Sequence, residues 1–370
     1  MPLNSNWQGL PDTLTTERLE IPNYAALAAQ NEGALRLNTE NTAHYITDYQ
    51  GELLDALLNN LSSLDNISKL QIVQERRLLA ESGMISYADL LPVISKLANE
   101  TSYMVVSAVS QVLEGLNRFV DGGSQTEEDY KALLKILSQS NFDRLGFEKQ
   151  EGESDEDEMV RQLIVGNMIK ADDETAKAQA SQIFDKYRDN LEKLPAAIRL
   201  QVLVNQIKHH ESKELTKLYL DLYVASNDGS FKNALSTALS YTKNQETLDE
   251  LLATWKDKFI VKPQDLSAWY ARFLSRDFTQ EAVWTWAREN WDWIKAALGG
   301  DMSFDSFVIS PAVVFKTEKR LAEYKAFFEP QLDDMAISRN ISMGIKEIAA
   351  RVELVKREKE AVEKAIRAAI

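Results

Sequence analysis

Apolar residues recur at helical spacing from Gly51 to the end of the chain. A spacing of three and four residues places side chains on one face of a helix. Three clear stripes are Leu53, Leu54, Leu57, Leu58 and Leu61; Leu90, Leu91, Ile94 and Leu97; and Leu215, Leu218, Tyr219 and Leu222. The pattern predicts helices of about 12 to 18 residues joined by short loops, in about eight antiparallel pairs.

The order of these helices indicates a repeat architecture. No exact sequence repeat is visible, but a rhythm of about 35 to 45 residues per helix pair is typical of HEAT-like arrays. We therefore expect a mainly α fold, a right-handed α-solenoid or superhelix of antiparallel helix pairs. Each pair would bury one face against the next and leave a curved concave surface.

Several helix starts carry sequence signals. Ser86-x-x-Asp89 and Ser124-x-x-Glu127 have the spacing of capping boxes. Lys262-Pro263 places proline in a first turn, and Thr317 precedes Glu318 as a candidate cap.

The first 48 residues follow a different pattern. They hold three of the eight prolines, and short alternation in residues 35–37 and 43–49 flanks the turn-rich tetrad 38–41. This predicts a β-hairpin. A two-stranded ribbon is marginal alone, so we expect its sheet partners to lie outside this chain. The expected domains are a β segment at 1–48 and a helical domain at 49–370.

Charge and composition exclude several classes of protein. The 370 residues are 44% apolar, and 42 basic against 57 acidic residues give a net charge of −15. That balance disfavours nucleic-acid and membrane partners, whose surfaces are anionic. The chain has no signal-peptide pattern and no apolar run of about 18 residues, so the expected location is cytoplasmic.

Catalytic and metal-binding motifs are absent from the sequence. There are no cysteines and only three histidines, His44, His209 and His210. Adjacent histidines on a helix point about 100° apart, so His209 and His210 do not form the i, i+4 pair of a zinc site. No H-E-x-x-H, G-x-S-x-G or phosphate-binding glycine motif occurs. We expect no catalytic residue and no metal ligand in this chain.

Three features invite a functional interpretation, but a structural one is favoured for each. Residues 148–158 hold seven acidic side chains and one lysine, and they predict a solvated loop rather than a cation site. His209-His210 is expected to face solvent or cap carbonyls at a helix end. The aromatic group is expected to form core between helices, as i, i+7 pairs, rather than a ligand platform. It comprises Trp269, Phe273, Trp284, Trp286, Trp291 and Trp293.

A series of soft motifs resembles the C-terminal region of zinc aminopeptidases of the aminopeptidase N family, most closely lactic-acid-bacterial and streptococcal members. The resemblance runs from about residue 20 to the end of the chain, in the family's order. Its motifs lie at residues 35–49, 79–87, 97–103, 145–147, 161–163, 264–265, 284–293, 315–317, 327–329 and 345–356.

The resemblance implies a part of a larger enzyme. The family's zinc motif and its Gly-x-Met-Glu-Asn motif lie upstream of this region and do not occur here. The chain is expected to open inside a β-sandwich domain and continue as the helical domain that encloses peptide substrates. Its parent would be a zinc-dependent aminopeptidase, whose catalytic domain is the implied partner, and this chain alone is expected to be inactive. The alternatives are a free-standing HEAT-like scaffold for peptide or protein partners, and a complete enzyme with an unrecognised site.

Basic residues late in the chain are candidates for substrate binding. A peptide whose amine lies at the zinc presents its carboxylate toward the helical domain, and relatives carry basic residues in the corresponding late helices. Charge-assisted hydrogen bonds would favour a cation there. The candidates are Lys316, Lys319 and Arg320, with Arg339 and Arg351 as further ones. The competing interpretation is that they are solvated surface charges.

Overall fold

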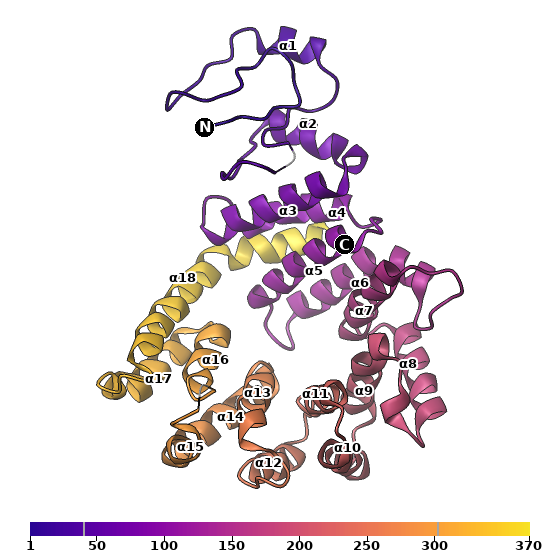
Figure 1. Ribbon diagram of the computed structural model, residues 1–370, viewed down its shortest axis with the longest axis vertical. Coiled ribbons are helices and arrows are strands. Elements are labelled where there is room, and N and C mark those ends of the chain that lie inside the picture. Colours follow the sequence, from indigo (N-terminus) through magenta and orange to yellow (C-terminus); the bar gives the residue numbers. More distant parts are fainter. Residues whose placement is uncertain (40, 302) are drawn as a thin grey trace. The chain divides into compact units, whose positions relative to one another are not determined.

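The chain folds into helices arranged in two compact units (Figure 1). The computed structural model describes residues 1–39, 41–301 and 303–370, which hold eighteen α-helices and no β-sheet. Unit 1 comprises Met1–Ala171 and Glu358–Ile370, and unit 2 comprises Asp172–Arg357. The prediction of a mainly α fold is confirmed.

The helices of unit 1 are α1 (Tyr24–Gln30), α2 (Glu52–Asn60), α3 (Asn66–Glu81), α4 (Leu91–Lys96), α5 (Tyr103–Leu116), α6 (Gln125–Leu145) and α7 (Asp155–Lys170), with 3₁₀ turns η1 (Leu61–Ser63), η2 (Tyr87–Leu90) and η3 (Asn117–Phe119). Those of unit 2 are α8 (Glu174–Tyr187), α9 (Ala196–His210), α10 (Lys213–Ala225), α11 (Gly229–Leu239), α12 (Gln245–Thr254), α13 (Pro263–Leu274), α14 (Asp277–Glu289), α15 (Trp291–Leu298), α16 (Ser306–Val314) and α17 (Glu318–Phe328), with η4 (Leu191–Lys193) and η5 (Glu329–Gln331). Helix α18 (Ser338–Ala368) contributes to both units.

Successive helices stack in two layers within each unit. In unit 1, α3 contacts α5 and α5 contacts α7, while α6 packs against α7. In unit 2, α9, α11, α13 and α16 contact one another in that order, and α8, α10 and α14 pack against α9, α11 and α13 (Figure 1). Stacking of helix pairs on their chain neighbours is typical of an α-solenoid.

The four helix-start signals are confirmed. Ser86 and Asp89 form a reciprocal capping box at η2, and the Oγ of Ser124 accepts the N–H of Glu127 at the start of α6. Pro263 occupies the first turn of α13. The side chain of Thr317 caps α17.

The hairpin predicted over residues 35–49 is not observed among the described residues, so that prediction is wrong. The backbone N–H groups of Asn38 and Thr39 donate to the carbonyls of Leu3 and Asn4, at 2.8 and 2.9 Å. They therefore pair with the start of the chain and not with residues 43–49. The only β-bridge found in the described part of residues 1–48 joins Pro2 to Thr13.

The side chain of Asn38 explains why no hairpin turn forms. Asn38 has a positive φ of 54°, and its side-chain amide bonds the backbone N–H and C=O of Ala43 at 2.8 and 2.9 Å. These bonds close a local loop, which competes with regular strand pairing. The predicted turn also includes residue 40, which lies outside the described residues.

The acidic run at 148–158 is a loop only in its first part. Helix α7 begins at Asp155, so four of the carboxylates occupy its first turn, where the positive end of the helix dipole favours them. Upstream, Glu153 forms an ion pair with Arg161, whose guanidinium is fully buried and also donates to the carbonyl of Leu145. The prediction of a solvated loop is therefore wrong for Asp155–Glu158.

The tryptophan-rich segment forms core, as predicted. Trp269 and Trp284 are fully buried. However, α14 ends at Glu289 and α15 begins at Trp291, so the i, i+7 pairs do not lie on one helix. Trp286 and Trp293 still pack edge-on, at 6.2 Å between ring centroids, whereas Trp284 and Trp291 both pack edge-on against Phe327, at 5.6 Å.

The end of α18 belongs to unit 1. There Val362 and Ile366 are fully buried, and the Glu358 carboxylate accepts a hydrogen bond from the Ser86 hydroxyl. Arg367 pairs with Asp129 at 3.0 Å. The last residues of the chain thus complete the core of the unit that contains the first residues.

Gly344 allows α18 to approach α16 and α17 closely within unit 2. A Cβ at this position would overlap the hydroxyl of Tyr324 and lie 2.9 Å from the Cβ of Ala312. Tyr324 is fully buried and its hydroxyl donates to the Val308 carbonyl at 3.2 Å, so it has little freedom to move aside.

We predict that Gly344→Ala lowers the free energy of unfolding by about 1–3 kcal/mol, the usual cost of overpacking. The cost should be smaller in a Tyr324→Phe background, because the overlapping hydroxyl is gone. Urea unfolding of the four proteins of this double-mutant cycle measures the coupling. Gly300→Ala, where the added Cβ meets open space, is the control. An equal cost of Gly344→Ala in both backgrounds would contradict the packing described.

A second prediction concerns Glu75 on α3, a buried carboxylate whose Oε1 accepts from Gln71 at 3.1 Å. Burial raises the pKa of Glu75 above its ordinary value of 4.5, and the bond from Gln71 only partly opposes this. The folded protein therefore holds this proton more tightly than the unfolded chain does. Stability contributed by protonated Glu75 should be fully present below about pH 4.5 and lost as the pH rises through the raised pKa.

Glu75→Gln should remove this loss and flatten the pH dependence of the unfolding free energy. Urea titrations from about pH 4 to about pH 8 test it, with the exposed Glu52→Gln as control. An unchanged slope in Glu75→Gln would show that another group is responsible.

Candidate functional site

The predicted basic group surrounds the start of α17 in unit 2, and Arg320 is its centre. The Arg320 guanidinium is nearly buried and pairs with Glu281 at 2.9 Å and Glu323 at 2.6 Å. Its Nε donates to Gln280 at 3.3 Å, and its charge lies 5.3 Å from the ring centroid of Phe315. These contacts tie α17 to α14, so Arg320 has a structural role.

The neighbouring lysines are more accessible. Lys319 is exposed, and its Nζ lies 3.4 Å from Glu281 and 3.6 Å from Glu323. Burial opposes ionisation of Glu281, yet Arg320 and Lys319 together hold the pKa of that carboxyl below its usual range. Lys316 is half-buried and interacts within the chain.

The two arginines of α18 have different environments. The Nη1 of Arg351 donates to the carbonyls of Ala312 and Phe315, at 2.7 and 2.9 Å, and so caps the end of α16. Arg339 is exposed, and no hydrogen bond or ion pair joins it to the other four candidates in the described part of the chain. The structure thus brings Arg320, Lys319 and Arg351 around one helix junction and leaves Arg339 apart.

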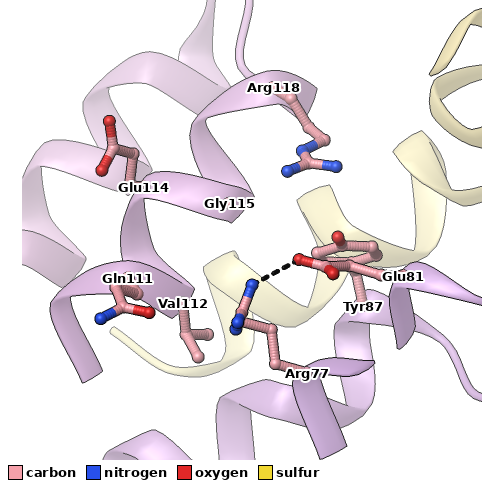
Figure 2. Close-up of a pocket in the computed structure, with 8 residues that line it drawn as sticks. All are labelled: Arg77, Glu81, Tyr87, Gln111, Val112, Glu114, Gly115 and Arg118. Atoms are coloured by element: carbon pink, nitrogen blue, oxygen red, sulfur yellow. Dashed lines mark hydrogen bonds and ion pairs between the residues drawn. The ribbon is translucent and has the colours of Figure 1, made fainter. Parts of the chain in front are cut away.

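A polar pocket of about 320 Å³ lies within unit 1, between α3, η2, α5 and η3 (Figure 2). Figure 2 shows Arg77, Glu81, Tyr87 and Arg118 on one side of this pocket. Gln111 and three other residues of α5 form the other side. The full lining is Arg77, Glu81, Tyr87, Gln111, Val112, Glu114, Gly115 and Arg118.

The charges of this pocket are unequally compensated. Arg77 pairs with Glu81 at 2.6 Å, whereas Arg118 makes no ion pair within residues 1–39, 41–301 and 303–370. Its guanidinium lies 5.1 Å from the ring centroid of Tyr87. The Tyr87 hydroxyl is buried, and burial raises its pKa although Arg118 opposes the rise. Arg118 therefore offers a half-buried cation beside an aromatic face, which suits a single carboxylate.

Sequence analysis did not single out the residues of this pocket. They come from four elements, α3, η2, α5 and η3, which are brought together only by the fold. The one available signal was the pairing of arginine with aromatic or acidic residues near predicted helix ends, and that pattern is common in charged helices.

No metal site is formed by the described residues. No group of three or more His, Asp or Glu side chains lies close enough there to hold an ion. His209 and His210 end α9, as predicted, with His209 at 3.3 Å from Asp172 and His210 at 3.3 Å from Ser181. Among the same residues, no helix has the length and apolar character needed to cross a membrane.

Comparison with known proteins supports the resemblance found in the sequence. The chain is 57% identical to an aminopeptidase N of Lactococcus lactis subsp. lactis over 368 residues, which cover 99% of this chain and 43% of that protein. It is 37% identical to aminopeptidase N of Lactobacillus helveticus, over 100% of this chain and 44% of the relative. A more distant relative is aminopeptidase M1-B of Oryza sativa subsp. japonica, 28% identical over 81% of this chain and 36% of that protein.

The chain spans less than half the length of these relatives. Residues 35–350 match the family model described as the ERAP1-like C-terminal domain, which covers most of both units. The chain is a member of the ERAP1-like C-terminal domain family.

Proposed function

We propose that this chain is the C-terminal, substrate-enclosing domain of a zinc-dependent aminopeptidase that removes N-terminal residues from peptides. The match of residues 35–350 to the ERAP1-like C-terminal domain carries the proposal. In this view the zinc and its ligands belong to the catalytic domain, which is the partner of this chain in a cytoplasmic protein. The proposed boundary between the N-terminal segment and the helical domain lies near residue 48.

A substrate-enclosing domain needs an extended binding surface, and stacked helices can form one. Stacked helix pairs present side chains from many successive helices along one surface, which suits an extended peptide. When the peptide amine is held at the catalytic centre, the far end of the peptide reaches the helical domain. Binding there positions the substrate and limits its length, without any chemical step by this chain.

The pocket around Arg118 is the best candidate for the carboxylate end of the peptide. Arg118 has no competing carboxylate within ion-pair distance in the described residues, whereas Arg320 is already paired with two. Arg351 caps backbone carbonyls. Of the late basic residues, Lys316, Lys319 and Arg339 remain as proposed contacts of the peptide.

We predict that the 370-residue chain alone binds no stoichiometric zinc and hydrolyses no aminoacyl-anilide. When it replaces the matching 43% of the lactococcal aminopeptidase N, the chimera should retain activity, because the two sequences are 57% identical over that portion. Metal analysis of the chain and steady-state kinetics of the chimera test both statements.

The lactococcal protein without this portion serves as the control. A folded chimera no more active than that control would favour the free-standing scaffold. One tightly held zinc per isolated chain, with turnover abolished by a chelator, would instead favour a complete enzyme.

A further prediction separates substrate binding from stability. In the chimera, Arg118→Ala should lower kcat/KM about tenfold for peptides with a free carboxylate, which is about 1.4 kcal/mol of differential binding. It should leave kcat/KM for an aminoacyl-anilide unchanged, since that substrate lacks the carboxylate. Arg339→Ala tests the late basic residues in the same way.

Arg320→Ala is the matched control for these arginine substitutions. It leaves Glu281 and Glu323 without their buried partner and should lower thermal stability, with equal effects on both substrates. Equal effects of Arg118→Ala on peptide and anilide would contradict a role in carboxylate binding.

A further inference from the structure

A second polar pocket, of about 310 Å³, lies wholly within unit 2. It is formed where α10, α11 and α13 meet, and its volume is at the lower end of small-ligand sites. Three cations line it, Lys232, Lys262 and Arg272, together with one carboxylate, Asp265. We call this group of residues the α11–α13 pocket.

Arg272 and Lys232 are half-buried, whereas Lys262 is exposed. The side chain of Arg272 lies on α13, and its Nη2 donates to the Oδ1 of Asn233 at 3.0 Å. No carboxylate lies within ion-pair distance of it in residues 1–39, 41–301 and 303–370. Burial lowers the pKa of the Arg272 guanidinium, and the nearby Tyr223 and Asp265 only partly oppose this. Its charge is therefore incompletely compensated by the protein.

The two lysines are likewise without an acidic partner in the described part of the chain. The Nζ of Lys232 lies 4.4 Å from the ring centroid of Tyr223, a cation–π contact that leaves its N–H donors available. Lys262 is exposed at the N-cap of α13 and makes no side-chain cap bond. The positive end of the dipole of that twelve-residue helix adds to the positive electrostatic potential of the pocket.

The single carboxylate of the pocket is held by a neutral donor. The Tyr223 hydroxyl donates to the Oδ2 of Asp265 at 3.0 Å. Burial raises the pKa of Tyr223 to about 12, so the hydroxyl keeps its proton at neutral pH. Three positive side chains and one negative side chain leave a formal charge of +2 on the lining.

The positive charge of this pocket contrasts with the net charge of −15 of the whole chain. The protein has 57 acidic against 42 basic residues, and several other half-buried or buried arginines are paired with carboxylates, as Arg161, Arg199 and Arg320 are. The pocket contains three cationic side chains and one carboxylate, so an external anion would balance the remaining positive charge. A dianion matches the excess charge, whereas a single carboxylate would match only half of it.

We propose that the α11–α13 pocket binds a small dianionic oxyanion ligand, a phosphoryl group or a dicarboxylate. Arg272 supplies the planar pair of N–H donors that suits either group, and Lys232 and Lys262 supply point charges on either side. The site is separate from the proposed peptide-carboxylate pocket of unit 1, and it does not depend on the aminopeptidase assignment.

Calorimetric titration of the 370-residue chain with inorganic phosphate, glycerol 3-phosphate and glutarate tests the proposal. We expect saturable binding of at least one of these ligands at one site per chain. Preference for the two phosphates identifies a phosphoryl group as the ligand, and preference for glutarate identifies a dicarboxylate. No binding of any of the three overturns the proposal.

Substitutions of residues that line the α11–α13 pocket test whether the ligand binds there. Arg272→Gln and Lys262→Gln should each weaken binding by about tenfold or more, because each removes a charge-assisted contact. Lys262 is exposed, so its variant keeps the test valid even when Arg272→Gln does not fold. Lys217→Gln, at an exposed pair with Asp221 on α10, should leave binding unchanged. Binding that survives both pocket substitutions, or that Lys217→Gln weakens equally, overturns the proposal.

Discussion

Burial of each helix against its neighbours in the chain is the constraint on which this structure depends. A single amphipathic helix cannot cover its apolar face, so each helix pair must be covered by the next. In unit 2 this produces the series α9, α11, α13 and α16, with α8, α10 and α14 behind it. Both polar pockets lie where three or more such elements meet, because close helix packing leaves space only at these junctions.

The helices could be predicted from the sequence because their signals are local. Leucine stripes and caps such as Ser86 and Thr317 act within one or two turns, and the structure confirms both caps, although Leu218 of the third stripe is exposed. The hairpin prediction was wrong for a non-local reason. The backbone N–H of Asn38 donates to the carbonyl of Leu3, more than thirty positions earlier in the chain. Alternation shows that a segment is extended, but it does not identify the partner of that segment.

Charges were harder to assign than helices. Arg320 and Lys319 are adjacent in the sequence, yet one is nearly buried in an ion-pair network and the other is exposed. Both side chains lie near Glu281, and the difference comes from Gln280 on α14 and the ring of Phe315, which only Arg320 contacts in the described structure. Arg118 and Arg272 are candidate ligand-binding residues for the opposite reason, because neither has an acidic partner among the described residues. No single segment of the sequence shows this.

The shared helix α18 has a consequence for synthesis on the ribosome. Most of unit 1 precedes unit 2 in the sequence, but Val362, Ile366 and the Glu358 partner of Ser86 follow unit 2. Domains generally fold in the order in which they emerge. Here part of the apolar core of unit 1 stays uncovered until the end of α18 has emerged, so unit 1 begins to fold before unit 2 and is completed after it.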